Sequence, residues 1–371
     1  MSSITQGCGG SSSYPVLRGL DAQPLAEARN IVLCVIDGLG YDYLVRRGAG
    51  SQLHQRLHRR LHAVAPPTTS ASVTTFLTGV APQQHGLTGW FMWLREVGSV
   101  VTVLPFLTRC NRADLTQAGI TPQELIAQPP LFARLPVRSY SLMPDWLANS
   151  VFNRALLGNA ELVLHKGMED YFSRINTVVR AHAERKFLYA YWPYFDGLAH
   201  DHGVGSAQAA EHFARLDDGF AKLFADLAGT ETVVLVTADH GFVDTRPETR
   251  LRVNDLPELQ RCLAVPLCGE PRLAYCYVRR GMEQTFADYV RSELAHAVML
   301  HRGDELIAQG LFGLGAPHPE LHSRVGDYVL ALKDDYILTQ RLPGETPLHL
   351  VGHHGGLSAA EVEVPLVLAC C

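Results

Sequence analysis

The sequence lacks a long hydrophobic run, and this argues against a membrane-spanning protein. No apolar stretch in its 371 residues reaches the ~18 residues that a transmembrane helix needs. The first residues, MSSITQGCGGSSSYP, are polar and rich in glycine and serine, without the apolar centre of a secretory signal. We therefore expect no membrane contact, a cytoplasmic location and a flexible lead-in over residues 1–28.

The sequence also lacks an excess of positive charge and a metal-binding cysteine pattern. Its formal net charge is −5, so it has no overall basic character of the kind that binds a nucleic acid duplex. Its eight cysteines are scattered and contain no CxxC pair. They are typical of small buried residues in a reduced protein. Pairing among Cys262, Cys268 and Cys276 is the alternative if the chain is exported.

Hydrophobic residues make up 47% of the chain, and their pattern predicts an α/β fold. Strand-like runs occur at 31–36, 100–104, 139–143, 187–192, 232–237, 273–278, 327–332 and 365–369. Helical periodicity between several of them, clearest over 207–227, favours a doubly wound, mostly parallel sheet with helices on both faces. We expect one domain over 29–371. The irregular region 242–326 indicates either a small insertion or cap, or a few added strands.

Three of the apolar runs end on side chains that bind metal ions. The run at 31–36 ends on Asp37-Gly38, and the run at 187–192 is followed by Asp196 and, four residues later, His200. The run at 232–237 leads to Asp239-His240-Gly241. Because the carboxyl ends of parallel strands share one edge of a sheet, these groups are predicted to converge there.

A fourth segment, Val351-Gly-His-His-Gly-Gly-Leu357, adds an imidazole from a glycine-rich loop. The ligand set then contains the three aspartates, His200, His240 and either His353 or His354. Carboxylate and imidazole ligands without thiolate favour Zn²⁺, with Mn²⁺ or Fe as alternatives. Six ligands exceed what one tetrahedral ion needs, so the set predicts two divalent ions.

A hydroxyl nucleophile is predicted in the segment Ala65-Pro-Pro-Thr-Thr-Ser-Ala-Ser-Val-Thr-Thr-Phe-Leu-Thr-Gly79. The prolines end a loop, a threonine follows as N-cap, and a helix of small residues ends at Gly79. The free N–H groups and the dipole at a helix N-terminus suit a phosphate oxygen. A metal ion bound to that hydroxyl would lower its pKa and activate it.

These motifs together resemble the alkaline phosphatase superfamily, in particular its bacterial type I phosphodiesterase/nucleotide pyrophosphatase branch. The resemblance rests on Val-Ile-Asp37-Gly38, Pro67-Thr-Thr69 with Thr78-Gly79 and His85-Gly86, Asp196-x-x-x-His200-x-x-Gly203, Asp239-His240-Gly241 and His354-Gly355. They occur in the family's order and span residues 31–356.

The resemblance implies a role for each matching residue. One metal ion would be held by Asp37, Thr69, Asp239 and His240, with Thr69 as nucleophile; the other would be held by Asp196, His200 and His354. Counting back from Thr78-Gly79 selects Thr69 over Thr68. The family usually carries an Asn three residues after the nucleophile, and here that position is Ser72, whose hydroxyl would donate to the phosphoryl oxygen over a shorter reach. The Ser70 backbone N–H would share that charge, and Trp90 would line a leaving-group pocket.

The implied activity is hydrolysis of a small-molecule phosphoester, a class that includes nucleotides, through a covalent phosphothreonine-type intermediate. A phosphodiesterase is favoured because no Arg lies beside Thr69 to neutralise the additional charge of a monoester. The alternatives are a phosphomonoesterase or a phosphonate (C–P) hydrolase of the same superfamily. Outside the enzymes, the chain would be a silent metal-binding module.

Overall fold

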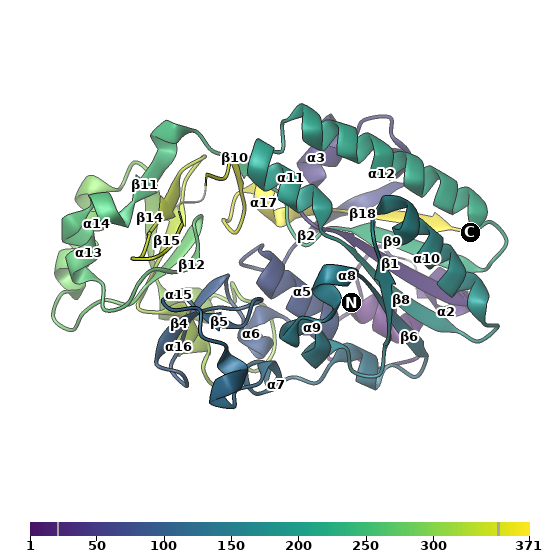
Figure 1. Ribbon diagram of the computed structural model, residues 1–371, viewed down its shortest axis with the longest axis horizontal. Helices are drawn as coiled ribbons and strands as arrows, with labels where there is room; N and C mark the ends of the chain where they lie inside the picture. The colour runs from purple at the N-terminus through teal and green to yellow at the C-terminus, as the bar shows by residue number, and fades with distance from the viewer. Residues whose placement is uncertain (21, 347–348) are drawn as a thin grey trace.

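Two seven-stranded sheets form the framework of the protein. The structure is a computed structural model that describes residues 1–20, 22–346 and 349–371. Figure 1 shows the central sheet with its long helices on the right and the second sheet, with its own helices, on the left.

The central sheet is mostly parallel, as the sequence predicts. Its strands, in spatial order, are β2 (Leu57–His62), β18 (Glu363–Cys370), β9 (Thr232–Thr237), β1 (Asn30–Ile36), β8 (Lys186–Trp192), β6 (Arg138–Pro144) and β7 (Glu161–His165). The five strands from β9 to β7 run parallel, and β18 is antiparallel to both β9 and β2. Strand β1 therefore lies between β9 and β8, the two other strands that lead to predicted metal ligands.

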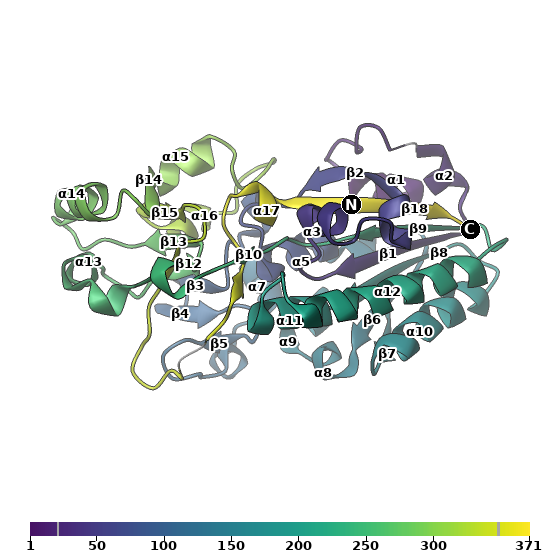
Figure 2. The same ribbon diagram turned by 90° about the horizontal axis from the view of Figure 1, so that it is seen from above.

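Helices cover both faces of the central sheet because its strands are apolar on both sides. In β1, Ile31, Leu33 and Val35 belong to one core cluster, and Val32, Cys34 and Ile36 belong to the other. The first cluster includes side chains of α1 (Ser2–Gly7), α2 (Ala22–Glu27), α5 (Thr69–Thr78), α7 (Pro122–Ile126), α8 (Asp145–Ala148) and α9 (Val151–Leu156). The second includes those of α3 (Tyr41–Arg46), α4 (Gln52–Gln55), α10 (Met168–Ala181), α11 (Tyr194–His202) and α12 (Ala207–Asp226). Figure 2 shows α10 and α12 side by side along the sheet.

The N-terminal segment differs from the sequence prediction of a flexible lead-in over residues 1–28. It contains α1 and α2, and Ile4, Cys8 and Leu25 are buried in the core beside the central sheet. Arg185 also donates hydrogen bonds to the carbonyl oxygens of Gly7 and Leu25. The prediction was wrong because the few apolar residues of this segment are too widely spaced to show a periodic pattern.

The second sheet is antiparallel and combines two distant parts of the chain. Its strands, in spatial order, are β14 (Val298–Arg302), β15 (Tyr328–Leu332), β13 (Leu273–Cys276), β12 (Cys268–Glu270), β3 (Phe91–Leu94), β4 (Ser99–Thr102) and β5 (Leu107–Thr108). The predicted strands at 100–104, 273–278 and 327–332 are therefore strands, but they lie outside the parallel sheet. Residues 242–326 supply the three strands β12, β13 and β14, and β15 follows just beyond them. Residues 91–108 supply the other three strands, which join the sheet through the pairing of β12 with β3.

The remaining elements pack around the second sheet or connect the two sheets. Helices α13 (Pro257–Cys262) and α14 (Glu283–Glu293) bury apolar residues in one cluster, and α15 (Gly303–Ala308) and α16 (Leu321–Val325) in another. The other short elements are α6 (Pro82–His85), α17 (Ala359–Val362), β10 (Val243–Asp244) paired with β17 (Gly352–His353), and β11 (Arg250–Arg252) paired with β16 (Ile337–Thr339).

A buried ion pair connects the second sheet to the segment before β18. The guanidinium of Arg272, just beyond β12, forms hydrogen bonds of 3.0 and 2.8 Å with the two carboxylate oxygens of Glu361 in α17. Both side chains are fully buried, and Arg272 also donates to the carbonyl oxygen of Tyr336. This bidentate pair fixes the second sheet against the segment that leads into β18.

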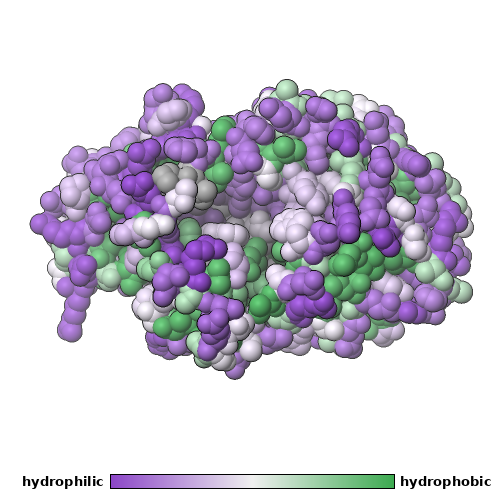
Figure 3. Space-filling model, in the orientation of Figure 1, coloured by the Kyte–Doolittle hydropathy of each residue, from purple (hydrophilic) through white to green (hydrophobic). Residues whose placement is uncertain are grey.

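The described residues form neither a membrane-spanning helix nor a disulfide bond. No helix among the described residues is long and apolar enough to span a membrane. All eight cysteines lie in the described part of the chain and are unpaired, including Cys262, Cys268 and Cys276. Figure 3 shows a hydrophobic patch on the right-hand part of the molecule, in the region of the central sheet. Leu164, in the edge strand β7, is among the exposed hydrophobic residues.

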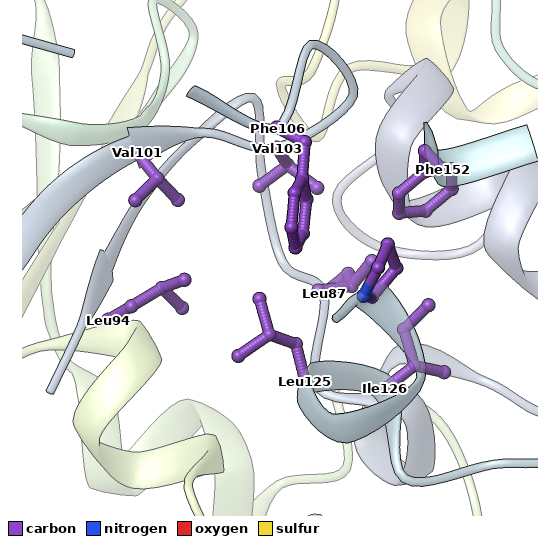
Figure 4. A pocket seen from close by; sticks show the side chains of 9 residues that line it. Leu87, Leu94, Val101, Val103, Phe106, Leu125, Ile126 and Phe152 are labelled. Carbon is purple, nitrogen blue, oxygen red and sulfur yellow. The ribbon is translucent and has the colours of Figure 1, made fainter. Parts of the chain in front are cut away.

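One apolar cavity lies between the β3–β4 hairpin and α7. It has a volume of ≈ 10 Å³ and is lined by Leu87, Leu94, Val101, Val103, Phe106, Pro122, Leu125, Ile126 and Phe152 (Figure 4). A space of about one water with no polar lining offers a water no hydrogen bond. This cavity is therefore a packing void.

Candidate metal centre and nucleophile

The predicted aspartates meet because β9, β1 and β8 are neighbours and run in the same direction. Asp37 directly follows β1, Asp239 lies just beyond the end of β9, and Asp196 lies in the first turn of α11, just beyond β8. All three carboxylates therefore reach the same edge of the sheet.

His240 occupies the centre of this cluster. Its Nε2 lies 3.2 Å from Asp37 Oδ1, 3.5 Å from Asp239 Oδ2 and 3.9 Å from Asp196 Oδ1. Two groups of three residues have ligand atoms within 4.8 Å of one another; one is Asp37, Asp239 and His240, and the other is Asp196, His240 and His354. His200 lies outside the second group, although its Nε2 is 3.4 Å from Asp196 Oδ1.

The imidazole rings are oriented to present lone pairs to the cluster. Nδ1 of His200 faces the carbonyl oxygen of Gly352 at 2.9 Å, and Nδ1 of His354 faces that of Pro67 at 3.2 Å. Nδ1 of His240 faces its neighbouring carbonyl at Gly241, also at 3.2 Å. Because a carbonyl oxygen only accepts hydrogen bonds, each Nδ1 carries the proton, and each Nε2 offers a lone pair to the carboxylates.

Lone pairs that face carboxylate oxygens fit a site for cations. Asp37 Oδ1, Asp196 Oδ1 and Asp239 Oδ2 are buried and have no hydrogen-bond partner. Two ligands ~2.0–2.1 Å from one tetrahedral zinc ion would lie about 3.3 Å apart, close to the shorter distances in this cluster. The residues therefore fit divalent metal ions in both chemistry and spacing.

The electrostatics of the carboxylates agree with this fit. Burial, followed by the nearby charge of Asp196, raises the pKa of Asp37 well above its ordinary value. Burial raises the pKa of Asp196 to about 7, and burial together with Asp37 raises the pKa of Asp239 to about 8. The three carboxylates ionise less readily because they are buried close to one another. Positive ions bound between them would stabilise their ionised forms.

The helix α5 presents Thr69 to the cluster. Thr69 is its first residue, and its Oγ1 lies 3.3 Å from His240 Nε2. Thr68, the N-cap residue, makes no capping hydrogen bond, because its hydroxyl donates to Glu270 Oε1 at 2.7 Å. The first N–H groups of α5, including that of Ser70, therefore have no side-chain cap and stay available to an anion.

The Ser72 hydroxyl binds the protein backbone, whereas the sequence expectation placed it at a phosphoryl oxygen. Ser72 Oγ donates a hydrogen bond of 2.8 Å to the carbonyl oxygen of Asp239. Its proton therefore points at the backbone just beyond β9 and not at a substrate oxygen. This contact fixes α5 against the end of the strand that carries Asp239 and His240. Ser70 Oγ is buried without a hydrogen-bond partner, and its free backbone N–H is the group that sequence reasoning selected.

The structure also separates the histidine alternatives. His354 Nε2 lies 3.9 Å from Asp196 Oδ1, whereas His353 Nδ1 contacts the hydroxyl of Thr245. His85 contacts the hydroxyl of Thr75 and accepts from Leu87 N, so it anchors the loop after α5.

Trp90 is connected to the nucleophile loop through its backbone. Its N–H donates to Glu270 Oε1 at 2.6 Å, the same oxygen that accepts from Thr68. The Glu270 side chain therefore links the backbone of Trp90 to Thr68. The proposed role of Trp90 in a leaving-group pocket stays a prediction.

Sequence reasoning missed two residues, Tyr191 and Glu270. The Tyr191 hydroxyl donates a short hydrogen bond to Asp37 Oδ2, which leaves Asp37 Oδ1 facing His240. The only sequence signal for Tyr191 was weak: a tyrosine hydroxyl within the apolar run of β8, two residues after another tyrosine. Glu270 carries no sequence signal, because its contacts to the site depend on the pairing of β12 with β3.

Comparison with known proteins agrees with this arrangement. The family model for type I phosphodiesterase/nucleotide pyrophosphatase matches residues 31–357. Mouse ectonucleotide pyrophosphatase/phosphodiesterase 5 superposes with a TM-score of 0.66 at 17% identity, over 91% of this chain and 87% of that chain. Phosphonoacetate hydrolase from Sinorhizobium meliloti 1021 superposes with a TM-score of 0.63 at 18% identity, over 92% and 90%.

No curated protein sequence matches the chain. The family match nevertheless covers most of its length, and both structural neighbours share its fold. The family and the α/β fold predicted from the sequence are thus confirmed. The chain belongs to the type I phosphodiesterase/nucleotide pyrophosphatase family, a family of metal-dependent hydrolases that act on phosphoric ester bonds.

Proposed function

We propose that the chain hydrolyses phosphodiesters through a covalent intermediate on Thr69. The observation that carries this proposal is the position of Thr69 Oγ1, at the uncapped N-terminus of α5 and 3.3 Å from His240 Nε2. A hydroxyl placed both among metal ligands and beside free backbone N–H groups suits attack on phosphorus.

The reaction has two displacements at phosphorus. In the first, a bond forms between Thr69 Oγ1 and phosphorus while the ester bond to the leaving oxygen breaks; the Thr69 proton passes to solvent and the leaving oxygen takes up a proton. In the second, a water oxygen bonds to phosphorus and the bond to Thr69 breaks, which restores the hydroxyl. The N–H groups of Ser70 and its neighbours in α5 would stabilise the charge on the non-bridging oxygens.

The residues present would hold two divalent ions, for which we propose Zn²⁺. One ion would be held by Asp37, Asp239 and His240 together with Thr69. The other would be held by Asp196, His200 and His354. When bound, such ions lower the pKa of a hydroxyl nucleophile and neutralise charge on the phosphoryl and leaving oxygens. The proposal of two ions rests on the two overlapping ligand groups around His240.

The structural neighbours support a small phosphorus-containing substrate. An inactive variant of the mouse protein has been solved in complex with AMP, and the Sinorhizobium enzyme in complex with phosphonoformate and with phosphonoacetate. We propose a phosphodiester, a class that includes nucleotide derivatives, as the substrate of this chain. A phosphonate is the second candidate, since one neighbour is a phosphonate hydrolase.

A direct assay tests the proposal. The purified chain, stripped with a chelator and reloaded with Zn²⁺ or Mn²⁺, is assayed with bis-p-nitrophenyl phosphate, p-nitrophenyl phosphate and phosphonoacetate. We expect the diester to be hydrolysed fastest, and Thr69→Ala to lose at least about 10³-fold in kcat even with the metal ion in excess. Full activity of Thr69→Ala would defeat the mechanism. Preference for phosphonoacetate would select the second candidate, and metal-loaded protein without hydrolysis of any substrate would select the silent module.

A further inference from the structure

Glu270 is a buried acid that the second sheet places beside the catalytic residues. It is the last residue of β12, and its side chain is 7% exposed. Its Oε1 accepts hydrogen bonds from both Thr68 Oγ1 and Trp90 N. These two contacts hold the carboxylate in a fixed place, one residue away from the nucleophile Thr69.

The Glu270 side chain also passes the loop that carries His354. A Cβ atom at Gly355 would lie 2.5 Å from Glu270 Cγ, so the acid packs directly against the residue after this metal ligand. Glu270 is therefore a fourth acidic group around the site, beside the aspartates at positions 37, 196 and 239.

Within the described residues, no Lys or Arg balances this negative charge at close range. Their hydrogen bonds and ion pairs include none to the metal-ligand side chains or to Glu270. The nearby guanidinium of Arg272 is taken by Glu361, and both of these side chains are fully buried. Two divalent ions would cancel the four carboxylates, and no further positive charge is in contact to meet a substrate that carries two negative charges.

We propose that the carboxylate of Glu270 makes the site select phosphodiesters over phosphomonoesters. A diester carries one negative charge, whereas a monoester at alkaline pH carries two, and like charges repel strongly in a partly buried site. Glu270 thus acts on specificity, through the charge next to the phosphoryl group. This inference rests on the proposed function, because it assumes in-line attack by Thr69 at the N-terminus of α5.

The test compares Glu270→Gln with the native chain, both loaded with Zn²⁺. Glutamine has the same size, and its Oε1 can accept the same hydrogen bonds from Thr68 and Trp90, so the substitution removes charge and keeps the anchor. The ratio of kcat/KM for p-nitrophenyl phosphate to that for bis-p-nitrophenyl phosphate is measured at about pH 9, well above the second phosphate pKa of ~6. We expect E270Q to raise this ratio roughly tenfold.

A binding measurement gives a second readout that does not depend on turnover. Calorimetric titration with inorganic phosphate, a dianion at this pH, should show tighter binding to E270Q than to the native chain. Dimethyl phosphate, a monoanion, should bind the two proteins with more similar affinity.

Thr68→Val is the matched control for the anchor. It removes the hydroxyl that donates to Glu270 but leaves the charge, held by Trp90 N, so the substrate ratio should stay near the native value. An unchanged ratio in E270Q, with diester hydrolysis retained, would overturn the inference and leave the proposed function intact. A ratio that rises equally in Thr68→Val would also overturn it, because the anchor and not the charge would then be responsible. Failure of the native chain to hydrolyse any diester would instead be a failure of the proposed function.

Discussion

The imidazole rings of His240 and His354 stack with their centroids 3.7 Å apart and their planes within 16° of parallel. Both Nε2 atoms lie 3.9 Å from the same oxygen, Asp196 Oδ1. Burial, followed by the neighbouring His240 and His200, lowers the pKa of His354 well below its ordinary value. His354 therefore stays neutral at physiological pH, which is the form that binds a metal ion.

This geometry predicts different effects of substituting the two adjacent histidines. His354→Ala removes an Nε2 from the cluster, and we expect its affinity for Zn²⁺ to fall by a factor of about 100 or more. His353→Ala removes a contact with Thr245, outside the ligand cluster, so its affinity should stay near the native value. Competition with a chromogenic chelator measures both. Equal losses in the two variants would contradict the assignment of His354.

A second prediction concerns the two tyrosines of β8 that face the same side of the strand. Tyr191→Phe removes the hydroxyl that holds Asp37 Oδ2, so Asp37 can turn and its metal ion should bind ~10–100-fold more weakly. Tyr189→Phe is the matched control, because the Tyr189 hydroxyl is buried without a hydrogen-bond partner. It should leave metal affinity unchanged and keep or raise the thermal midpoint.

The same chelator competition, with thermal denaturation as the folding control, distinguishes these variants. Unchanged metal affinity in Tyr191→Phe would show that the Asp37 carboxylate is held by other contacts.

The third prediction concerns the stability of the metal-free protein as pH rises from about 6.5 to about 8. The pKa values of Asp196 and Asp239 are raised by burial to about 7 and about 8, above the ordinary 3.8. In this range the folded chain keeps protons that the unfolded chain has released, so the free energy of unfolding should fall as pH rises. Below about 6.5, the lowered pKa values of His200 and His354 act in the opposite direction.

Thermal denaturation in the presence of EDTA, at several pH values, measures this trend. Added Zn²⁺ should raise the midpoint of denaturation most at the high-pH end of the range. There the carboxylates are ionised, so they repel one another most strongly in the metal-free protein. A metal-free midpoint that climbs between pH 6.5 and 8 would show that these aspartates ionise easily in the folded chain.

A fourth prediction concerns the contact between the two sheets. Arg272→Met leaves the carboxylate of Glu361 buried without its partner, and we expect a loss of ~3–5 kcal/mol in the free energy of unfolding. Arg261→Met is the control, because Arg261 pairs with Glu258 on the surface and its loss should leave the denaturation midpoint nearly unchanged. Chemical denaturation compares the two. A small effect of Arg272→Met would mean that water reaches Glu361 when the guanidinium is removed.

Much of the central sheet and of the ligand set could be predicted from the sequence, because both follow from short-range patterns. The apolar runs predicted at 31–36, 187–192 and 232–237 are β1, β8 and β9 to within one residue. Parallel strands place their carboxyl ends at one edge, so Asp37, Asp196 and Asp239 could be assigned to the same edge from the sequence. That they meet there depends on β9, β1 and β8 being neighbours. The order of the motifs was enough to identify the family.

The tertiary structure decided what depends on pairing between distant segments. The N-terminal residues fold onto the core, and strands at 91–108 join those at 268–332, because each buries an apolar surface that local periodicity does not reveal. The pairing of β12 with β3 brings Glu270 to Thr68. In the central sheet, the packing of α5 directs Ser72 to the carbonyl of Asp239, and the pairing of β8 with β1 brings the Tyr191 hydroxyl to Asp37. The sequence by itself determined which carboxylates, imidazoles and hydroxyl group are available for the proposed metal site and nucleophile. Only the tertiary packing decided the charge and the hydrogen bonds around them, since those contacts join residues far apart in the chain.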